Sequence, residues 1–205
     1  MIGNATSSPS SQNVSRETFL PLAEYVALLL KWNSKINLIG PATESDIWTR
    51  HIEDSLQLMP LIPASAKTLV DFGSGAGLPG MVIAIARPDL QITLVEQDQR
   101  KAAFLMEAKR VLQLSNVTVE ATDIAKLTAT YNIVTARALS SLTNLLTMAT
   151  PCMEPDSVCI FPKGENFIAE LTVAKQQWHF DTDIKTSKTN AESAVLLVTN
   201  VTSHP

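Results

Sequence analysis

A run of glycines beside a buried acid is the strongest chemical signal in this sequence. Gly73, Gly75 and Gly77 follow an apolar segment that contains Asp71, and Pro79 stands just beyond them. Glycines let a loop adopt unusual backbone angles and let a ligand approach main-chain atoms without a Cβ in the way. Proline fits the first turn of a helix, where a missing N–H costs little. The pattern predicts a ligand-binding loop between a buried strand and a helix.

A second acid, Glu96, ends the next apolar segment, where a carboxylate can bind both hydroxyls of a ribose. The residues from Gly75 to Gly80 also satisfy the dinucleotide pattern G-x-G-x-x-G, so a nicotinamide-dependent oxidoreductase is one alternative. Asp71 favours S-adenosylmethionine instead, because its carboxylate can hold an ammonium group and would repel a pyrophosphate. Asp71 can also simply fix the loop.

Several charged residues outside the loop are further candidates. Arg137 directly follows the expected strand 133–136, at the edge where open α/β sheets bind ligands, although a surface salt bridge is its plainer role. His51 and Asp54 share one face of an expected helix, where they can brace the loop, contact a ligand or merely pack. Lys31 and Lys35 are helical neighbours that can touch phosphates or form a solvated face.

The elements that must position these residues follow from apolar periodicity. After Pro63, short apolar runs alternate with helical patterns, which predicts an α/β fold with a mostly parallel, doubly wound sheet. The expected strands cover residues 68–72, 91–96, 117–120, 133–136 and 157–161, and the helices 78–87, 100–112, 142–149 and 166–176. The segments 179–184 and 194–201 have no helix between them, which predicts a hairpin or an antiparallel edge pair.

Two helical patterns, 16–32 and 46–58, come before this alternation and predict an N-terminal helical cap. We therefore expect a flexible tail at 1–15 and a single domain at 16–205. Within that domain the cap spans 16–63 and the Rossmann-like core spans 64–205. A chain of 205 residues, 45% of them hydrophobic, suits one such domain.

Composition limits the partners and the compartment. The formal net charge is −4, so any nucleic acid must be held by a local basic patch. Cys152 and Cys159 are expected to be buried and reduced, and three scattered histidines suggest no metal site. The N-terminus lacks a secretory pattern, and no apolar run is long enough for a membrane helix, so we expect a cytoplasmic protein.

With these features in view, the chain resembles the bacterial ribosomal RNA small-subunit methyltransferase G family, also called glucose-inhibited division protein B. The resemblance extends from about Phe19 to the last strand. It rests on Lys31-Trp32-Asn33, Asn37-Leu38, Arg50-His51-Ile52, Asp54-Ser55, the Gly75 to Gly80 loop, Arg87-Pro88, Lys101, Phe104-Leu105, Arg137-Ala138 and Lys163-Gly164. It implies a Rossmann-like class I methyltransferase that transfers a methyl group from S-adenosylmethionine to N7 of a guanine in small-subunit ribosomal RNA.

The resemblance also assigns roles to residues. It places Gly73 and Leu78 at the methionine end of the cofactor, Glu96 at the ribose and the main chain of Ile124 and Ala125 at the adenine. Together with the residues found from the loop itself, the expected cofactor-binding set is Asp71, Gly73, Gly75, Leu78, Glu96, Ile124, Ala125 and Arg137. Arg137 is also the expected catalytic residue. The resemblance places Lys163 on the RNA side, and the expected RNA-binding set is Lys31, Arg50, His51 and Lys163. We expect ribosomal RNA or a ribosomal particle as partner, no metal, and a monomer.

The residues after the fourth expected strand agree with a ring-nitrogen acceptor. Guanine N7 has a free lone pair, so the reaction needs alignment rather than a general base. The segment Thr135 to Leu139 contains neither the Asn/Asp-Pro-Pro-aromatic motif used on exocyclic amines nor a Pro-Cys nucleophile. Three positions depart from the family pattern: Asp123 stands where a basic residue is common, Ala125 where Glu is usual, and Ser193 where an arginine is common. The positive charge lost at Asp123 and Ser193 keeps open a non-catalytic RNA- or cofactor-binding protein of the same fold.

Overall fold

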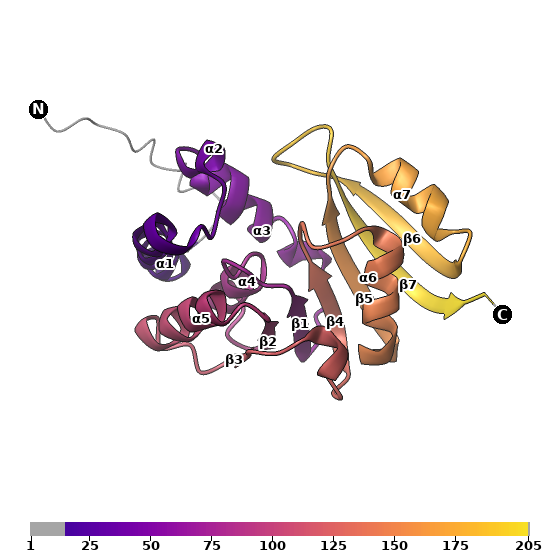
Figure 1. The fold of residues 1–205 in the computed structure, drawn as a ribbon, viewed down its shortest axis with the longest axis horizontal. Coiled ribbons are helices and arrows are strands. Elements are labelled where there is room, and N and C mark those ends of the chain that lie inside the picture. The colour runs from indigo at the N-terminus through magenta and orange to yellow at the C-terminus, as the bar shows by residue number, and fades with distance from the viewer. Residues whose placement is uncertain (1–14, 205) are drawn as a thin grey trace, which may run out of the picture.

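A seven-stranded sheet forms the centre of the molecule in the computed structural model, which describes residues 15–204 (Figure 1). The strand order is β3-β2-β1-β4-β5-β7-β6. Six strands run parallel, and β7 alone is antiparallel to its neighbours β5 and β6. The strands are β1 (Thr68–Phe72), β2 (Gln91–Val95), β3 (Val117–Glu120), β4 (Tyr131–Ala136), β5 (Met153–Lys163), β6 (Trp178–Thr186) and β7 (Ala194–Ser203).

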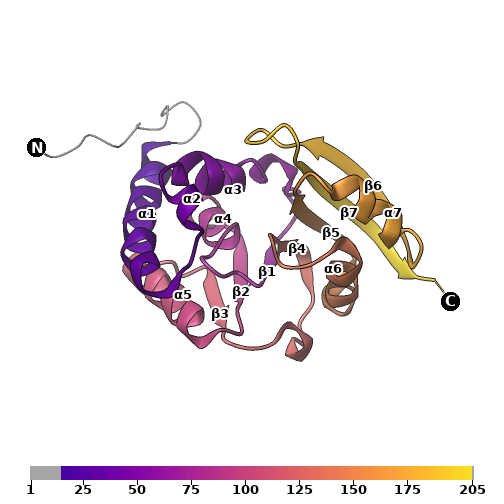
Figure 2. The same cartoon turned by 45° about the horizontal axis from the view of Figure 1, so that its top comes forward.

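Helices cover both faces of this sheet (Figures 1 and 2). The longer helices are α1 (Arg16–Ile36), α4 (Gly80–Ala86), α5 (Gln99–Val111), α6 (Leu142–Ala149) and α7 (Phe167–Ala174). Alternate strand residues face opposite cores: Leu69 of β1 packs with α1, α4 and α5, whereas Val70 packs with α6 and α7. This period-two pattern explains why the buried strands are apolar on both sides. The α/β class, the seven strands and the antiparallel terminal pair are confirmed.

The N-terminal region differs from the sequence-based expectation in detail. Ser15, assigned to the tail, caps α1 by accepting a hydrogen bond from the Thr18 N–H, and the rest of the expected tail lies outside the described residues. The helix expected at 46–58 is interrupted, and short pieces replace it. The short helical elements of the chain are α2 (Pro41–Glu44), the π-helix η1 (Trp48–Glu53), α3 (Asp54–Leu56), η2 (Met59–Leu61), η3 (Ile124–Lys126) and η4 (Thr150–Cys152).

The cap and the sheet share one apolar core. Leu22 and Leu29 of α1 belong to the same buried cluster as Leu69 and Leu94 of the sheet. Cys152 and Cys159 are free and buried, and burial raises the pKa of the Cys159 thiol. Among residues 15–204, no helix combines the length and apolar character needed to cross a membrane, and no three His, Cys, Asp or Glu side chains gather as a metal site.

Candidate functional site

Two clefts open beside the loop that joins β4 to α6. The first, here called the glycine-loop cleft, has a volume of 360 Å³. The second, here called the Arg137 cleft, has a volume of 520 Å³. The glycine-loop cleft is lined by Gly73, Gly75, Val95, Glu96, Gln97, Lys101, Thr122, Asp123, Ile124, Ala138, Leu139 and Met148. The Arg137 cleft is bordered by cap residues, the β4–α6 loop, the end of β5 and the β6–β7 hairpin, and it shares Ala138 and Leu139 with the first.

Asp71 fixes the glycine loop from below. Its side chain is fully buried, its Oδ2 accepts a hydrogen bond from the Gly80 N–H at 3.1 Å, and its Oδ1 accepts one from the Thr135 hydroxyl at 3.0 Å. Burial raises the pKa of this carboxyl to about 6, although the hydrogen bonds oppose the shift. A Cβ on Gly80 would lie 2.8 Å from Asp71 Oδ2, so only glycine lets α4 begin this close to β1. Of the two roles considered for Asp71, the structure supports bracing the loop rather than contacting a ligand.

Glu96 lies at the base of the glycine-loop cleft in a fixed orientation. Its Oε2 accepts a hydrogen bond from the Gly75 N–H and its Oε1 accepts one from the Asp98 N–H, both at 2.8 Å. The residue is only 7% exposed, yet it lines the cleft. Each carboxylate oxygen has a further lone pair that can accept a hydroxyl hydrogen. The hydrogen bond from the Gly75 N–H to the Glu96 side chain thus joins the glycine loop to the end of β2, both of which were found from sequence spacing.

The remaining residues expected at the cofactor are placed less uniformly. Leu78 is 5% exposed and belongs to the apolar core rather than to either cleft. Ile124 lines the glycine-loop cleft. The Ala125 N–H donates to Asp123 Oδ1 at 2.9 Å, so this main-chain donor already has a partner. Asp123, the acid that departs from the family pattern, therefore caps η3.

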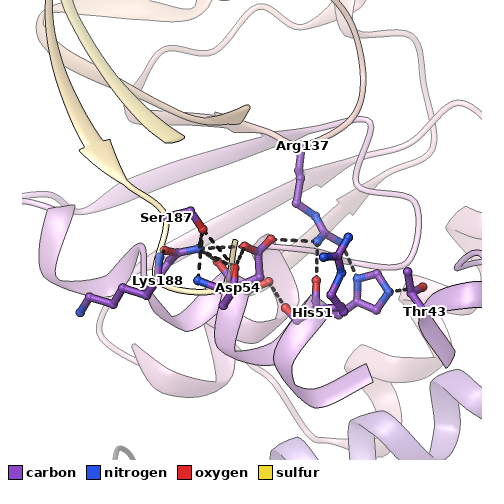
Figure 3. A network of polar contacts seen from close by, with 10 residues as sticks. Thr43, His51, Asp54, Arg137, Ser187 and Lys188 are labelled. Atoms are coloured by element: carbon purple, nitrogen blue, oxygen red, sulfur yellow. Dashed lines mark hydrogen bonds and ion pairs between the residues drawn. The ribbon is translucent and has the colours of Figure 1, made fainter. Parts of the chain in front are cut away.

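Arg137 connects the end of β4 to the cap (Figure 3). Its Nη1 donates to Asp54 Oδ2 at 3.1 Å and to the Arg50 carbonyl at 3.2 Å, and its Nη2 donates to His51 Nδ1 at 3.1 Å. The side chains of Arg137 and Asp54 are each only 19% exposed. Three of the five guanidinium N–H groups are used in these contacts, and two remain for a ligand.

His51 forms hydrogen bonds on both sides of its ring, to Arg137 and to Thr43 in the cap. Because Nδ1 accepts from Arg137, the ring proton belongs on Nε2, which lies 2.8 Å from the Thr43 hydroxyl (Figure 3). The Thr43 hydroxyl in turn donates to the Gly40 carbonyl at 2.9 Å. Burial and then the charge of Arg137 lower the pKa of His51 to about 4. His51 is therefore neutral at physiological pH and serves as a hydrogen-bonding group rather than as a phosphate-binding cation.

Asp54 also joins the cap to the β6–β7 hairpin. Its Oδ1 accepts from the Thr189 hydroxyl at 2.6 Å and from the Gln57 side-chain amide at 2.8 Å. The Lys188 N–H donates to Gln57 Oε1 at 2.8 Å, which holds the hairpin tip against α3 (Figure 3). Sequence spacing pointed to Asp54 but not to Thr189, because the two lie 135 residues apart.

The expected RNA-binding cations occupy three different settings. Lys163 is 9% exposed at its side chain, and its ammonium forms an ion pair with Glu170 at 2.6 Å and donates to the Ser140 carbonyl at 2.9 Å. The same Glu170 oxygen accepts from the Leu142 N–H at 2.7 Å. Lys163 therefore lines the Arg137 cleft as a support for the β4–α6 loop rather than as a free cation. The sequence offered no signal for Glu170.

The other two cations are exposed. Arg50 lies at the border of the Arg137 cleft. Lys31 lies on α1 and lines neither cleft, and its charge contributes to the lowered pKa of Glu107 on α5. The structure thus brings Arg50, His51, Lys163 and Arg137 together and leaves Lys31 apart.

Comparison with known proteins gives a consistent result. A family model described as rRNA small subunit methyltransferase G matches residues 20–196. A protein named ribosomal RNA small subunit methyltransferase G from Cereibacter sphaeroides is 46% identical over 90% of this chain and 90% of its own length. One with the same name from Gluconobacter oxydans is 46% identical over 91% of this chain and 96% of its own length.

Solved structures share the fold. A SAM-dependent methyltransferase from Aquifex aeolicus has a TM-score of 0.59 at 11% identity, with 84% of this chain and 96% of that chain covered. The ribosomal protein L11 methylase of Lactobacillus delbrueckii subsp. bulgaricus has a TM-score of 0.58 at 13% identity, with 73% and 78% covered. These two likenesses show a Rossmann-like methyltransferase fold.

Proposed function

Since the chain belongs to the rRNA small subunit methyltransferase G family, we propose that its two clefts together transfer a methyl group from S-adenosylmethionine to N7 of a guanine in small-subunit ribosomal RNA. The glycine-loop cleft holds the methyl donor, and the Arg137 cleft holds the guanine. The observation that carries this assignment is the fixed Glu96 carboxylate beside Gly75, in a cleft that shares a wall with the Arg137 cleft.

The glycine-loop cleft fits the methyl donor. Its 360 Å³ lies within the range of small-ligand sites, about 300–1,000 Å³. Gly73 has a φ of +60°, and its lack of a Cβ lets a ligand approach the main chain. Glu96 is placed to accept ribose hydroxyls, and Ile124 borders the same cleft. S-Adenosylmethionine supplies a methyl group activated by its sulfonium charge.

The expected repulsion between Asp71 and a pyrophosphate loses force in this structure. Asp71 is buried beneath the loop, and its carboxylate already accepts hydrogen bonds from the Gly80 N–H and the Thr135 hydroxyl, so its charge is a weak argument against a dinucleotide. Family membership, rather than this charge, disfavours the oxidoreductase.

The residues of the Arg137 cleft suit orientation rather than proton transfer. N7 of guanine reacts through its own lone pair, so the protein has no proton to remove. His51 Nδ1 already accepts a hydrogen bond from Arg137, and the low pKa of this ring keeps it neutral. The two free N–H groups of Arg137 can bind guanine O6 or a phosphate as a fork. We assign Arg137 the catalytic role of holding the base in line.

RNA binding then depends on few cations. Arg50 is the exposed cation of the Arg137 cleft and the proposed phosphate contact there. Ser193 lines the same cleft without charge, so the usual arginine at that position is missing where it would act. Lys31 is proposed as a peripheral contact, and Lys163 as a loop support.

Both clefts are built by one chain, so we propose that a monomer acts on the RNA or ribosomal particle in the cytoplasm.

The decisive experiment is methylation of small ribosomal subunits that lack this modification, with N7-methylguanine mapped by borohydride–aniline cleavage and primer extension. We expect one cofactor-dependent cleavage site, and the Glu96→Ala variant should be strongly impaired. Binding of both S-adenosylmethionine and RNA without methyl transfer would instead identify a non-catalytic binding protein. Binding of NADH in place of S-adenosylmethionine would support the oxidoreductase.

A further inference from the structure

Ala138 and Leu139 line both clefts, and Leu139 is the larger of the two side chains in this shared wall. The Leu139 side chain is 39% exposed, so it is accessible from the clefts that it lines. It lies directly over the glycine loop, because a Cβ built on Gly73 would be 2.6 Å from Leu139 Cδ1. Leu139 thus covers the glycine at which the methionine end of the methyl donor is proposed to bind.

The main chain on either side of Leu139 is firmly held. On one side, Arg137 binds the cap through Asp54 and His51. On the other, Lys163 binds the Ser140 carbonyl at 2.9 Å, and Glu170 accepts from the N-terminal N–H of α6 at 2.7 Å. A ligand that enters over Gly73 therefore meets a side chain that can rotate on a backbone that is anchored. Leucine has several staggered rotamers available for such a movement.

We infer that Leu139 is a positioning residue that couples the two clefts: a ligand on Gly73 turns its side chain toward the Arg137 cleft, where it offers an apolar surface to the guanine. This inference rests on the proposed function, because it assigns the methyl donor to Gly73. Its consequence is that occupation of the glycine-loop cleft raises the affinity for RNA. By linkage, RNA raises the affinity for the methyl donor by the same factor.

The test measures this coupling without turnover. S-Adenosylhomocysteine, which cannot donate a methyl group, is titrated by calorimetry, and the affinity for unmethylated small ribosomal subunits is measured with and without saturating S-adenosylhomocysteine. The wild-type protein should bind the subunits about fivefold more tightly when S-adenosylhomocysteine is present. Leu139→Ala should bind S-adenosylhomocysteine at least as tightly as the wild type, because no side chain has to move, and should lose the coupling.

Two further variants make the result specific. Leu139→Met keeps a long apolar side chain that can rotate, so most of the coupling should return. Met148→Ala shortens a residue that lines the glycine-loop cleft alone, and at saturating S-adenosylhomocysteine its coupling should match the wild type. Coupling that persists in Leu139→Ala, or a wild type that binds S-adenosylhomocysteine without any coupling, would overturn the inference and leave the proposed function intact. A wild type that binds no S-adenosylhomocysteine would overturn the proposed function itself.

Discussion

Replacement of Arg137 by lysine tests whether geometry or charge is needed at the end of β4. The guanidinium makes three contacts with the cap, to Asp54, the Arg50 carbonyl and His51, and a lysine ammonium cannot span all three. Losing two hydrogen bonds that involve charged groups costs about 3–6 kcal/mol of stability when both bonds are shielded from water. Because the Arg137–Asp54 pair is partly exposed, we expect a loss of about 2–4 kcal/mol. The free energy of unfolding should fall by this amount in urea titrations.

The same variant should slow methyl transfer more than it weakens binding. A lysine cannot donate paired hydrogen bonds to the guanine while it also contacts the cap, so the guanine is no longer held in line with the methyl group. Misaligned reactants typically lose on the order of 100-fold in rate. Single-turnover rates with saturating ribosomal subunits measure this step. The dissociation constant for S-adenosylmethionine should stay within a few-fold of the wild type, because Arg137 does not line the glycine-loop cleft.

Arg87→Lys is the matched control, since Arg87 also forms a paired contact, with the carboxylate of Asp89, but lies away from both clefts. It should keep the wild-type rate. An Arg137→Lys variant with the wild-type rate would refute the argument from geometry and show that charge suffices. A parallel loss of S-adenosylmethionine affinity would place Arg137 in the glycine-loop cleft instead.

Three other expectations follow from the same contacts. Glu96→Ala should weaken S-adenosylmethionine binding by about 1.5–3 kcal/mol in calorimetry, the scale of a hydrogen bond to a charged group, and unchanged affinity would remove Glu96 from the site. Asp71 should make the protein less stable as the pH rises from about 4 to about 6, because the unfolded carboxyl ionises first while the buried one keeps its proton up to its raised pKa. Asp71→Asn should abolish this slope, worth about 3 kcal/mol for a shift of two pKa units, and an identical slope in both proteins would contradict the assignment. Arg50→Ala should reduce the slope of RNA affinity against salt by about one phosphate contact. Lys163→Ala should leave that slope nearly unchanged, because the Lys163 charge is already paired with Glu170. A larger change of slope in Lys163→Ala than in Arg50→Ala would place Lys163 at the RNA interface.

Features carried by neighbouring residues were predictable from the sequence. The strands of the sheet show short apolar runs, and their alternation with helices predicted a mostly parallel sheet. The absence of a helix between the last two strands predicted the antiparallel terminal pair. The glycine loop and Glu96 were found by spacing, because the first βα turn and the end of the next strand meet at the same edge of a parallel sheet. The interrupted helix at 46–58 was not predicted, since its apolar period suits an α-helix and gives no sign of the π-helical turn η1.

Tertiary packing decided which charges are free and which are already used. Arg137 and Asp54 lie 83 residues apart and Lys163 and Glu170 belong to different elements, so no local pattern records that they meet. Asp71, just before the glycine loop, was expected either to hold the cofactor's ammonium group or to fix the loop, and the family resemblance placed Lys163 on the RNA side. In the structure Asp71 is buried and hydrogen-bonded to Gly80, and Lys163 is hydrogen-bonded to Ser140, so both support neighbouring loops. Leu139 gained its place between the clefts in the same way. A side chain's type and spacing determine what it can do, but its solvation and its partners depend on how distant elements pack, and these set its charge, its orientation and its accessibility to a ligand.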